Sequence, residues 1–217
     1  MLKLKNTVTP TLEQLEKTIE RNSLFQLENK HLLDSQIWKT LYDFQKDAVR
    51  GIINRIKKYG GCILADSVGL GKTFEALAVI KNFERIGQRV LVLCPKKLKE
   101  NWNQYRYTYK NNILEKDNFH YTVLSHTDLS RESGQAGDID LSKFAWEGYD
   151  LIVIDESHNF RNSKKESKDS EGNKKFTRYG RLLEEVLKPG VRTKVLLLSA
   201  TPVNNDLSDL KSQLNLI

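Results

Sequence analysis

The sequence has few of the residues from which disulfide scaffolds, zinc sites and membrane spans are built. It contains two cysteines and four histidines in 217 residues, and they form no cluster with the spacing of metal ligands. No apolar run approaches the roughly 20 residues that a membrane helix needs, and the first residues lack the apolar core of a signal peptide. Cys62 and Cys94 each fall in a predicted buried strand, which suits reduced thiols. We therefore expect a cytoplasmic protein without a membrane partner.

The composition that is present is that of a globular domain. Hydrophobic residues make up 39% of the chain and charged residues 29%, and the chain is long enough to bury a substantial core. The formal net charge of +7 favours a polyanionic partner only weakly, because many domains of this size are mildly basic and bind no nucleic acid.

The most informative stretch is a glycine-containing turn between a predicted strand and a predicted helix. Cys62–Leu64 is apolar, Phe74–Ile80 has helical spacing, and a Gly-Leu-Gly-Lys-Thr sequence lies between them. This layout aims backbone N–H groups and a helix N-terminus at a phosphate. Lys72 would supply positive charge for the outer phosphates, and Thr73 a hydroxyl for magnesium. Because Asp66 stands where the strict P-loop has its first glycine, a glycine-rich helix entry with a surface lysine remains an alternative.

Two helical segments precede this turn. The first is predicted within residues 1–35, where Thr11 could cap a helix that carries apolar residues at spacings of three and four. The second begins at Leu41, and its apolar stripe should pack on the core. Gln45 lies in its first turn, and its amide could read an adenine edge, although a solvated glutamine is the alternative. The stripe consists of Leu41, Phe44, Ala48, Val49, Ile52, Ile53 and Ile56.

After the turn and its helix, Arg89–Cys94 is predicted to be a fully buried strand. The lysines of Lys96–Trp102 follow at the carboxyl end of that strand, where ligands collect in open α/β sheets. They suit a phosphate backbone, and a merely solvated lysine face is the alternative. Trp102, Tyr105 and Tyr109 share a helical face, which favours core packing over stacking on bases.

A third strand is predicted over Asn118–Leu124, and Ser125–Thr127 follow it. His120 and His126 have no partner at metal-ligand spacing, so we expect both to be structural or exposed.

A pair of acids follows the next predicted strand, which consists of the four apolar residues Leu151–Ile154. Because parallel strands end at one edge of a sheet, Asp155 and Glu156 should lie at the same edge as the glycine turn. An aspartate there can hold magnesium, and an adjacent glutamate can orient or deprotonate an attacking water. Paired acids after a strand are often helix caps, but the upstream Gly-Leu-Gly-Lys-Thr sequence favours the catalytic interpretation.

The segment 159–181 carries most of the excess positive charge of the chain. We predict a mobile loop over 163–175, which either contacts nucleic acid or is simply solvated. A helix over Arg178–Leu187 should end at Pro189 and Gly190.

The last predicted strand is Lys194–Ser199. The hydroxyls of Ser199 and Thr201 should reach the same sheet edge as the acids, where they either bond to the acid pair or only cap the strand end. A final amphipathic helix is predicted from Leu207, Leu210, Leu214 and Ile217.

The order of these motifs resembles the first RecA-like lobe of superfamily-two helicases and translocases, and more narrowly the Swi/Snf-type ATPases. The resemblance covers about residues 36–217, which leaves 1–35 as a helical N-terminal extension or linker. It implies an α/β fold, a RecA-like P-loop NTPase lobe with a mainly parallel sheet flanked by helices. That family also tolerates aspartate at the position of Asp66. The likeness rests on Leu64–Thr73, Asp155–His158 with Arg161 and Asn162, and Ser199–Pro202 with Asn204 and Asn205.

The resemblance implies ATP and Mg²⁺ as cofactors and a role for each motif. Thr73 and Asp155 would hold the metal, Lys72 the phosphates, and Glu156 would activate water. Ser199 and Thr201 would couple hydrolysis to movement. The nucleotide would contact Gln45, Val68, Gly69, Leu70, Gly71, Lys72 and Thr73. The segments that touch a nucleic-acid backbone correspond to Lys96, Lys97, Ser125, His126, Thr127 and Arg161.

The sequence departs from the family pattern at two places. Ser157 lies within the acid motif, and Ser-Ala-Thr replaces the Thr-Gly-Thr common in chromatin remodellers. These departures favour prokaryotic motors as relatives.

The leading interpretation is the ATP-binding lobe of an ATPase that translocates on duplex DNA. A strand-separating helicase on DNA or RNA is a neighbouring possibility, and a non-hydrolysing nucleic-acid-binding module is another, although Lys72 and Glu156 argue against it. In this superfamily a second RecA-like lobe supplies arginines that stabilise charge on the γ-phosphate. We therefore expect the chain to be a fragment that binds nucleotide weakly and is nearly inactive alone.

Overall fold

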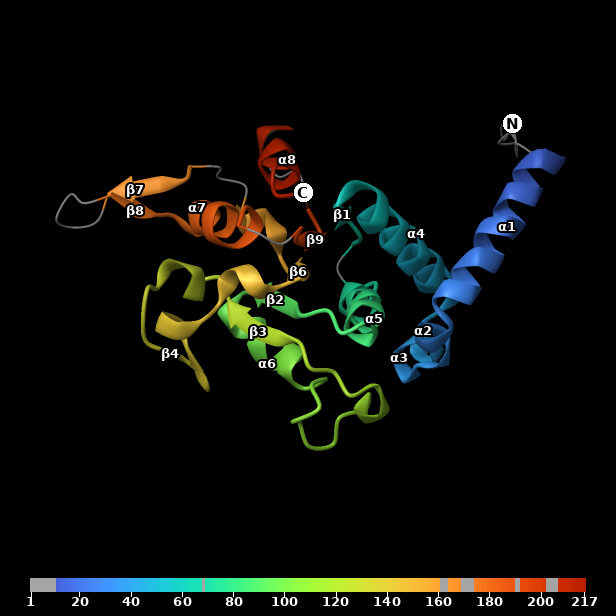
Figure 1. The fold of residues 1–217 in the computed structure, drawn as a ribbon, viewed down its shortest axis with the longest axis horizontal. Coiled ribbons are helices and arrows are strands. Elements are labelled where there is room, and N and C mark those ends of the chain that lie inside the picture. The colour runs from blue at the N-terminus through green and yellow to red at the C-terminus, as the bar shows by residue number, and fades with distance from the viewer. Residues whose placement is uncertain (1–10, 68, 161–163, 169–173, 190–191, 202–206) are drawn as a thin grey trace, which may run out of the picture.

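A five-stranded parallel sheet forms the centre of the chain, as the sequence predicts (Figure 1). The computed structural model describes residues 11–67, 69–160, 164–168, 174–189, 192–201 and 207–217. The central strands are β1 (Gly61–Leu64), β2 (Val90–Cys94), β3 (Thr122–Ser125), β6 (Leu151–Ile154) and β9 (Lys194–Leu198). Their order is β1-β9-β6-β2-β3, and every neighbouring pair is parallel.

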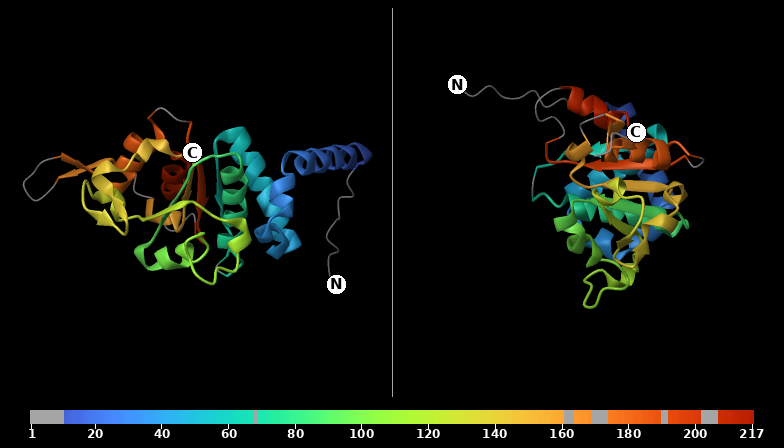
Figure 2. Two further views of the ribbon diagram at one scale, coloured as in Figure 1. Left: turned by 60° about the horizontal axis from the view of Figure 1, so that its bottom comes forward. Right: turned by 90° about the vertical axis from the view of Figure 1, so that its left-hand side faces the viewer.

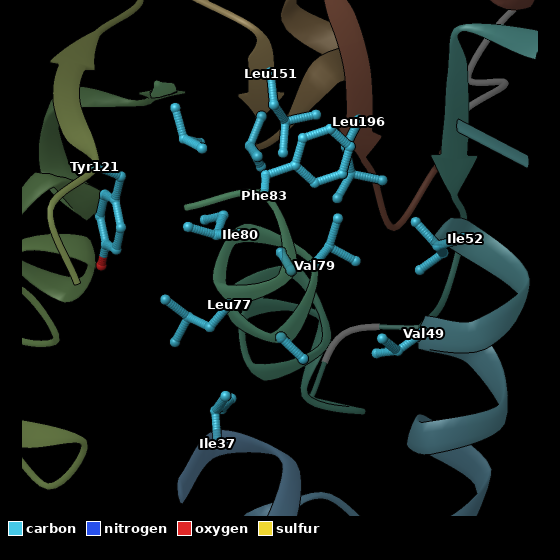
Figure 3. Close-up of a cluster of buried hydrophobic side chains, with 14 of the residues drawn as sticks. Ile37, Val49, Ile52, Leu77, Val79, Ile80, Phe83, Tyr121, Leu151 and Leu196 are labelled. Carbon is cyan, nitrogen blue, oxygen red and sulfur yellow. The ribbon is translucent and has the colours of Figure 1, made fainter. Parts of the chain in front are cut away.

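Helices cover both faces of the sheet, so its strands are apolar on both sides. Val90 and Val92 point to the face covered by α4 (Asp43–Tyr59) and α5 (Lys72–Arg85). Leu91 and Leu93 point to the opposite face, which is covered by α7 (Arg178–Arg181) and the π-helical turn η7 (Leu182–Leu187). Figure 3 shows apolar side chains of α5 between α4 and the strands.

The N-terminal segment is helical, as predicted, and consists of α1 (Leu12–Glu28), α2 (Lys30–Asp34) and α3 (Gln36–Thr40). Phe25 and Leu32 from this segment belong to the same buried cluster as α5 and the sheet. The boundary at residue 35 stays a prediction. Among the described residues, no helix is long and apolar enough to cross a membrane.

The remaining elements are short. The β4–β5 hairpin lies in the polar stretch after β3, and α6 follows β2. The bounds of these elements are α6 (Lys99–Asn103), α8 (Leu207–Leu214), β4 (Gln135–Ala136), β5 (Ile139–Asp140), and the 3₁₀ turns η1 (Lys96–Leu98), η2 (Glu115–Asp117), η3 (Asp128–Ser130), η4 (Leu141–Lys143), η5 (Trp146–Gly148) and η6 (Ser157–Phe160).

The prediction of an unstructured loop over 163–175 is wrong for the residues that the structure describes. β7 (Glu166–Lys168) and β8 (Lys174–Phe176) pair as antiparallel strands. Thr177 closes the hairpin onto α7, because its side chain accepts a hydrogen bond from the Gly180 amide. The hairpin extends from the end of the molecule opposite α1 (Figures 1 and 2). Pairing of backbone groups across the hairpin overrides the polar, charged composition that favours a loop.

Three predicted apolar faces also differ from the structure. Phe44 of the α4 stripe is 55% exposed and stacks on Tyr42. Tyr109 is exposed because α6 ends at Asn103, before the face that it was expected to share. Of the face predicted for the last helix, Leu210 is half-buried, but Leu214 is 51% exposed and Ile217, which follows α8, is 37% exposed. The third strand begins at Thr122, four residues after its predicted start.

The register of the sheet brings the carboxyl ends of the strands to one edge. Leu64 pairs with Leu198, Leu197 with Ile154, and Ile154 with Leu93. The glycine turn, the acid pair, Ser199 and the lysines after β2 therefore follow strands that end side by side, as the sequence analysis expected.

Candidate active site

The glycine turn between β1 and α5 adopts a backbone that requires glycine. Gly69 and Gly71 both have φ of 86°, a left-handed conformation that other residues rarely adopt. A Cβ atom on Gly71 would also collide with Nε2 of the Gln45 side chain. The Gly71 carbonyl accepts hydrogen bonds from the Phe74 and Glu75 amides and thereby begins α5.

Gln45 joins α4 to this turn. It is buried, so the alternative of a solvated glutamine is wrong. Its Oε1 accepts from the Tyr42 amide at 3.0 Å, and its Nε2 donates to the Leu70 carbonyl at 3.0 Å. The amide thus caps α4 and supports the turn. Its contact with adenine stays a prediction.

Lys72 is folded back onto the glycine turn. Its Nζ donates to the Asp66 carbonyl at 2.6 Å and to the Ser67 carbonyl at 3.0 Å. These neutral acceptors hold the ammonium at the mouth of the turn. A phosphate carries full negative charge and would compete well with them for the ammonium group.

The acid pair lies directly after β6. Asp155 Oδ1 accepts from the Glu156 amide at 2.9 Å, and its Oδ2 accepts from Trp102 Nε1 at 3.0 Å. Burial raises the pKa of Asp155, which the Trp102 hydrogen bond and the charge of Lys72 oppose. Glu156 is more accessible, and its Oε2 lies 3.2 Å from Nδ1 of His158.

The backbone at Glu156 is strained, because its φ is 51° and it is not glycine. Such a conformation costs of order 1–3 kcal/mol and persists only where neighbouring contacts enforce it. Here the Asn159 amide and side chain both donate to the Glu156 carbonyl. The turn therefore directs the Glu156 side chain along a path that an extended backbone would not give.

A cavity of about 340 Å³ separates the glycine turn from the acid pair. The Thr73 hydroxyl and the Asp155 carboxylate carry oxygen atoms of the kind that Mg²⁺ prefers, and the charge of Lys72 suits a phosphate. No group of three or more acid, histidine or cysteine side chains that could hold a metal occurs within the described ranges. The lining residues include Gly69, Gly71, Lys72, Thr73, Asn101, Gln104, Tyr105, Asp155 and Glu156.

Ser199 and Thr201 contact each other. The Ser199 hydroxyl accepts from the Thr201 amide at 3.2 Å, and the Ser199 amide donates to the Leu64 carbonyl at 3.1 Å. This geometry is that of a capped strand end. A role in coupling hydrolysis to movement stays a prediction.

The residues predicted to contact nucleic acid differ in exposure. Lys96, Lys97 and Thr127 are exposed at neighbouring strand ends. Ser125 and His126 are buried, because the Ser125 hydroxyl donates to Asp128 at 2.6 Å and the His126 ring packs edge-on against Phe160. The side chains of Ser125 and His126 are therefore inaccessible to nucleic acid, whereas those of Thr127 and the two lysines are accessible. Val68, Arg161, Asn162, Pro202, Asn204 and Asn205 lie outside the described residues.

Two side chains near the site have surroundings that the sequence did not predict. Trp102 is a core residue, as predicted, but it also donates a hydrogen bond to Asp155. Glu75 is fully buried, and its carboxylate oxygens have no hydrogen-bond partner within the described part of the chain. Burial, with the nearby Asp66, raises the pKa of Glu75 to about 7. The position of Trp102 after a lysine-rich strand end was a sequence signal for its contact with the site. Nothing in the sequence indicated the burial of Glu75.

Comparison with known proteins identifies the family. The sequence pattern of the SNF2-related domain matches residues 44–217. The chain belongs to this family. It is therefore the first RecA-like lobe of a Swi/Snf-type ATPase, as the order of its motifs predicts.

The relatives include bacterial and eukaryotic proteins, so they do not favour prokaryotic motors. The chain is 28% identical over 169 residues to an uncharacterized ATP-dependent helicase, YqhH, of Bacillus subtilis, which covers 74% of this chain and 27% of that protein. It is 28% identical over 199 residues to the ISWI chromatin-remodeling complex ATPase ISW1 of Saccharomyces cerevisiae, which covers 82% of this chain and 16% of that protein. The chain thus spans about a quarter or less of these relatives.

A solved structure has the same fold. The SWI2/SNF2 ATPase core of Sulfolobus solfataricus in complex with dsDNA superposes with a TM-score of 0.59 at 21% identity. The match covers 82% of this chain and 36% of the archaeal one.

Proposed function

We propose that the chain is the ATP-binding lobe of a DNA-dependent ATPase that couples hydrolysis to translocation on duplex DNA. The observation that carries the proposal is the single cavity that Lys72 and Thr73 share with Asp155 and Glu156. Membership of the SNF2-related family supports nucleotide hydrolysis. The duplex DNA in the archaeal ATPase core supports DNA as the partner.

Each residue of the cavity has one task in this proposal. Lys72 exchanges the Asp66 and Ser67 carbonyls for the outer phosphates of ATP. Thr73 and Asp155 hold Mg²⁺, which when bound neutralises charge on the phosphate oxygens. Glu156 orients a water for in-line attack and accepts its proton, for which it is placed by the strained turn after β6.

The DNA-facing edge and the nucleotide cavity share one short segment. Lys96 and Lys97 begin it and are exposed. Asn101 lines the cavity, and Trp102 donates to Asp155. If the phosphate backbone of DNA moved Lys96 and Lys97, this segment would pass the movement on to Asp155, the proposed metal ligand. This supports the proposal that DNA stimulates hydrolysis.

The second half of the nucleotide site comes from another RecA-like lobe in this proposal. Arginines of that lobe would stabilise the developing charge on the γ-phosphate. ATP hydrolysis by residues 1–217 alone should then be far slower than by the full-length protein. Equal rates for the two would contradict the need for a second lobe.

The decisive experiment is ATP hydrolysis by the full-length protein with and without duplex DNA. Lys72→Ala should abolish the DNA-stimulated rate, and Glu156→Gln should lower it by about 10²–10⁴-fold, because each removes a group that acts on the reacting phosphate or water. Lys110→Ala and Glu115→Gln, which alter exposed residues of the same types, are the controls. Unchanged hydrolysis in both site variants would refute these roles. Binding of DNA without hydrolysis by the wild type would indicate a non-hydrolysing module.

A further inference from the structure

Ser157, the residue at which the acid motif departs from its family pattern, makes a buried contact with the last helix. Its Oγ donates to Oε1 of Gln213 in α8 at 2.7 Å. Both side chains are fully buried, and they are 56 positions apart in the sequence. A buried hydrogen bond between two neutral groups has a direction and a length, which apolar contacts lack.

This contact and a second polar one lie on the face of α8 that meets the protein. Leu214 is exposed, whereas Ser212, Gln213 and, just after the helix, Leu216 are buried. The hydroxyl of Tyr179 in α7 donates to the Ser212 carbonyl at 3.2 Å. Gln213 also donates from Nε2 to the Asp209 carbonyl at 3.3 Å, one turn earlier in its own helix. These hydrogen bonds, together with the burial of Leu216, fix the rotation of α8.

The other end of the contact lies at the strained turn. Ser157 is bonded through the backbone to Glu156, whose φ is 51°. Asp155 and Asn159, which form hydrogen bonds with Glu156, both lie within three residues of it in the sequence. The Gln213 contact instead anchors the turn to an element that is remote in the sequence. A strained backbone needs such external anchors to persist.

We infer that Gln213 is a positioning residue for ATP hydrolysis. Through Ser157 it holds the backbone of Glu156 in the conformation that aims the carboxylate at the attacking water, and it links that conformation to the place of α8. The inference rests on the proposed function for its catalytic meaning. Gln213 itself does not line the nucleotide cavity.

The activity test compares Gln213→Leu, Ser157→Ala and the double variant in the full-length protein with duplex DNA. Each single variant should lower kcat by about tenfold, which corresponds to the loss of a hydrogen bond of about 1.4 kcal/mol. KM for ATP should stay unchanged, because the nucleotide contacts are kept. The double variant replaces both partners by apolar groups, so its melting temperature should return to that of the wild type. Its kcat should stay low. Recovery of kcat together with the melting temperature would overturn the inference, since the contact would then be simple packing.

Ser212→Ala is the matched control. Ser212 is the buried neighbour of Gln213, and its hydroxyl bonds within α8, to the Ser208 carbonyl at 3.0 Å. This variant should keep the wild-type kcat. A tenfold loss there would mean that any disturbance of α8 lowers the rate, which would also overturn a specific role for Gln213.

A second measurement separates failure of the inference from failure of the proposed function. Hydrogen exchange of the Glu156 and Asn159 amides reports the strained turn without any hydrolysis. In Gln213→Leu these amides should exchange about tenfold faster, while amides of β2 remain protected. Unchanged exchange would overturn the link. A wild-type protein that hydrolyses no ATP, with faster exchange in the variant, would reject the proposed function and keep the positional link.

Discussion

At the scale of single residues, the carboxylate of Asp155 is held by an indole. Trp102 packs edge-on against Tyr121 with ring centroids 6.2 Å apart, and its only polar atom donates to Asp155 Oδ2. A partner that orients a metal-binding carboxylate commonly changes metal affinity when it is removed. Trp102 thus combines packing with control of the proposed magnesium ligand.

Trp102→Phe keeps an aromatic ring in the core and removes the N–H donor. The Mg²⁺ concentration that gives half-maximal ATP hydrolysis should rise about 10- to 100-fold, because Asp155 loses its orienting partner. A magnesium titration of the full-length protein at fixed ATP measures this. Trp146→Phe, the same change at a buried tryptophan in the opposite cluster, should leave the titration unchanged. Equal titrations for Trp102→Phe and the wild type would make Trp102 a packing residue alone.

At the scale of elements, the N-terminal helices are part of the core. Leu32 of α2 is fully buried and shares a cluster with Leu77 of α5. The carboxylate of Asp117 accepts from the Gln36 and Ile37 amides and so fixes the start of α3. Figure 3 shows Ile37 directed toward the α5 side chains. Helices α1 and α2 therefore contribute to the folding of this lobe.

Leu32→Ala should lower the free energy of unfolding by about 2–5 kcal/mol, since it leaves a cavity between α2 and α5. Chemical denaturation of the chain measures the loss. Leu27→Ala, at a leucine of α1 that is 80% exposed, should change stability by less than about 0.5 kcal/mol. Similar small losses for both variants would show that these helices pack only loosely on the lobe.

At the scale of the whole molecule, stability depends on pH through buried groups that act in opposite directions. Burial lowers the pKa of His126 to about 4 from its usual 6.5. Between these values the unfolded chain binds a proton that the folded chain does not, so stability falls as the pH falls. Burial raises the pKa of Glu75 and of Glu84 to about 7 from 4.5. Those two groups stabilise the fold at low pH, and their contribution is lost as the pH rises toward 7.

His126→Phe should isolate the histidine contribution. Between pH 6.5 and pH 4, the free energy of unfolding of the wild type should fall by up to about 3 kcal/mol relative to that of the variant. Denaturant titrations of both proteins at several pH values measure the difference. A constant difference across this range would mean that His126 titrates normally in the folded chain.

Sequence alone determined the parallel sheet and the sheet edge that carries the chemistry. Buried strands are apolar runs, and parallel strands end together, so Lys72, Asp155 and Ser199 could be placed at one edge without coordinates. The helix that starts at Lys72 follows from the glycines before it and the apolar spacing after it. These features depend on residues close together in the chain, which is why the pattern contains them.

Tertiary structure decided what those residues touch. The Trp102–Asp155 and Ser157–Gln213 contacts join residues 53 and 56 positions apart, and contacts at such separations leave no periodic signal. The burial of His126 and the outward face of Leu214 likewise depend on which elements pack against them. The local sequence pattern determines on which strand or helix a residue lies. Only the packing of the whole molecule determines whether its side chain contacts solvent, a neighbour or the site.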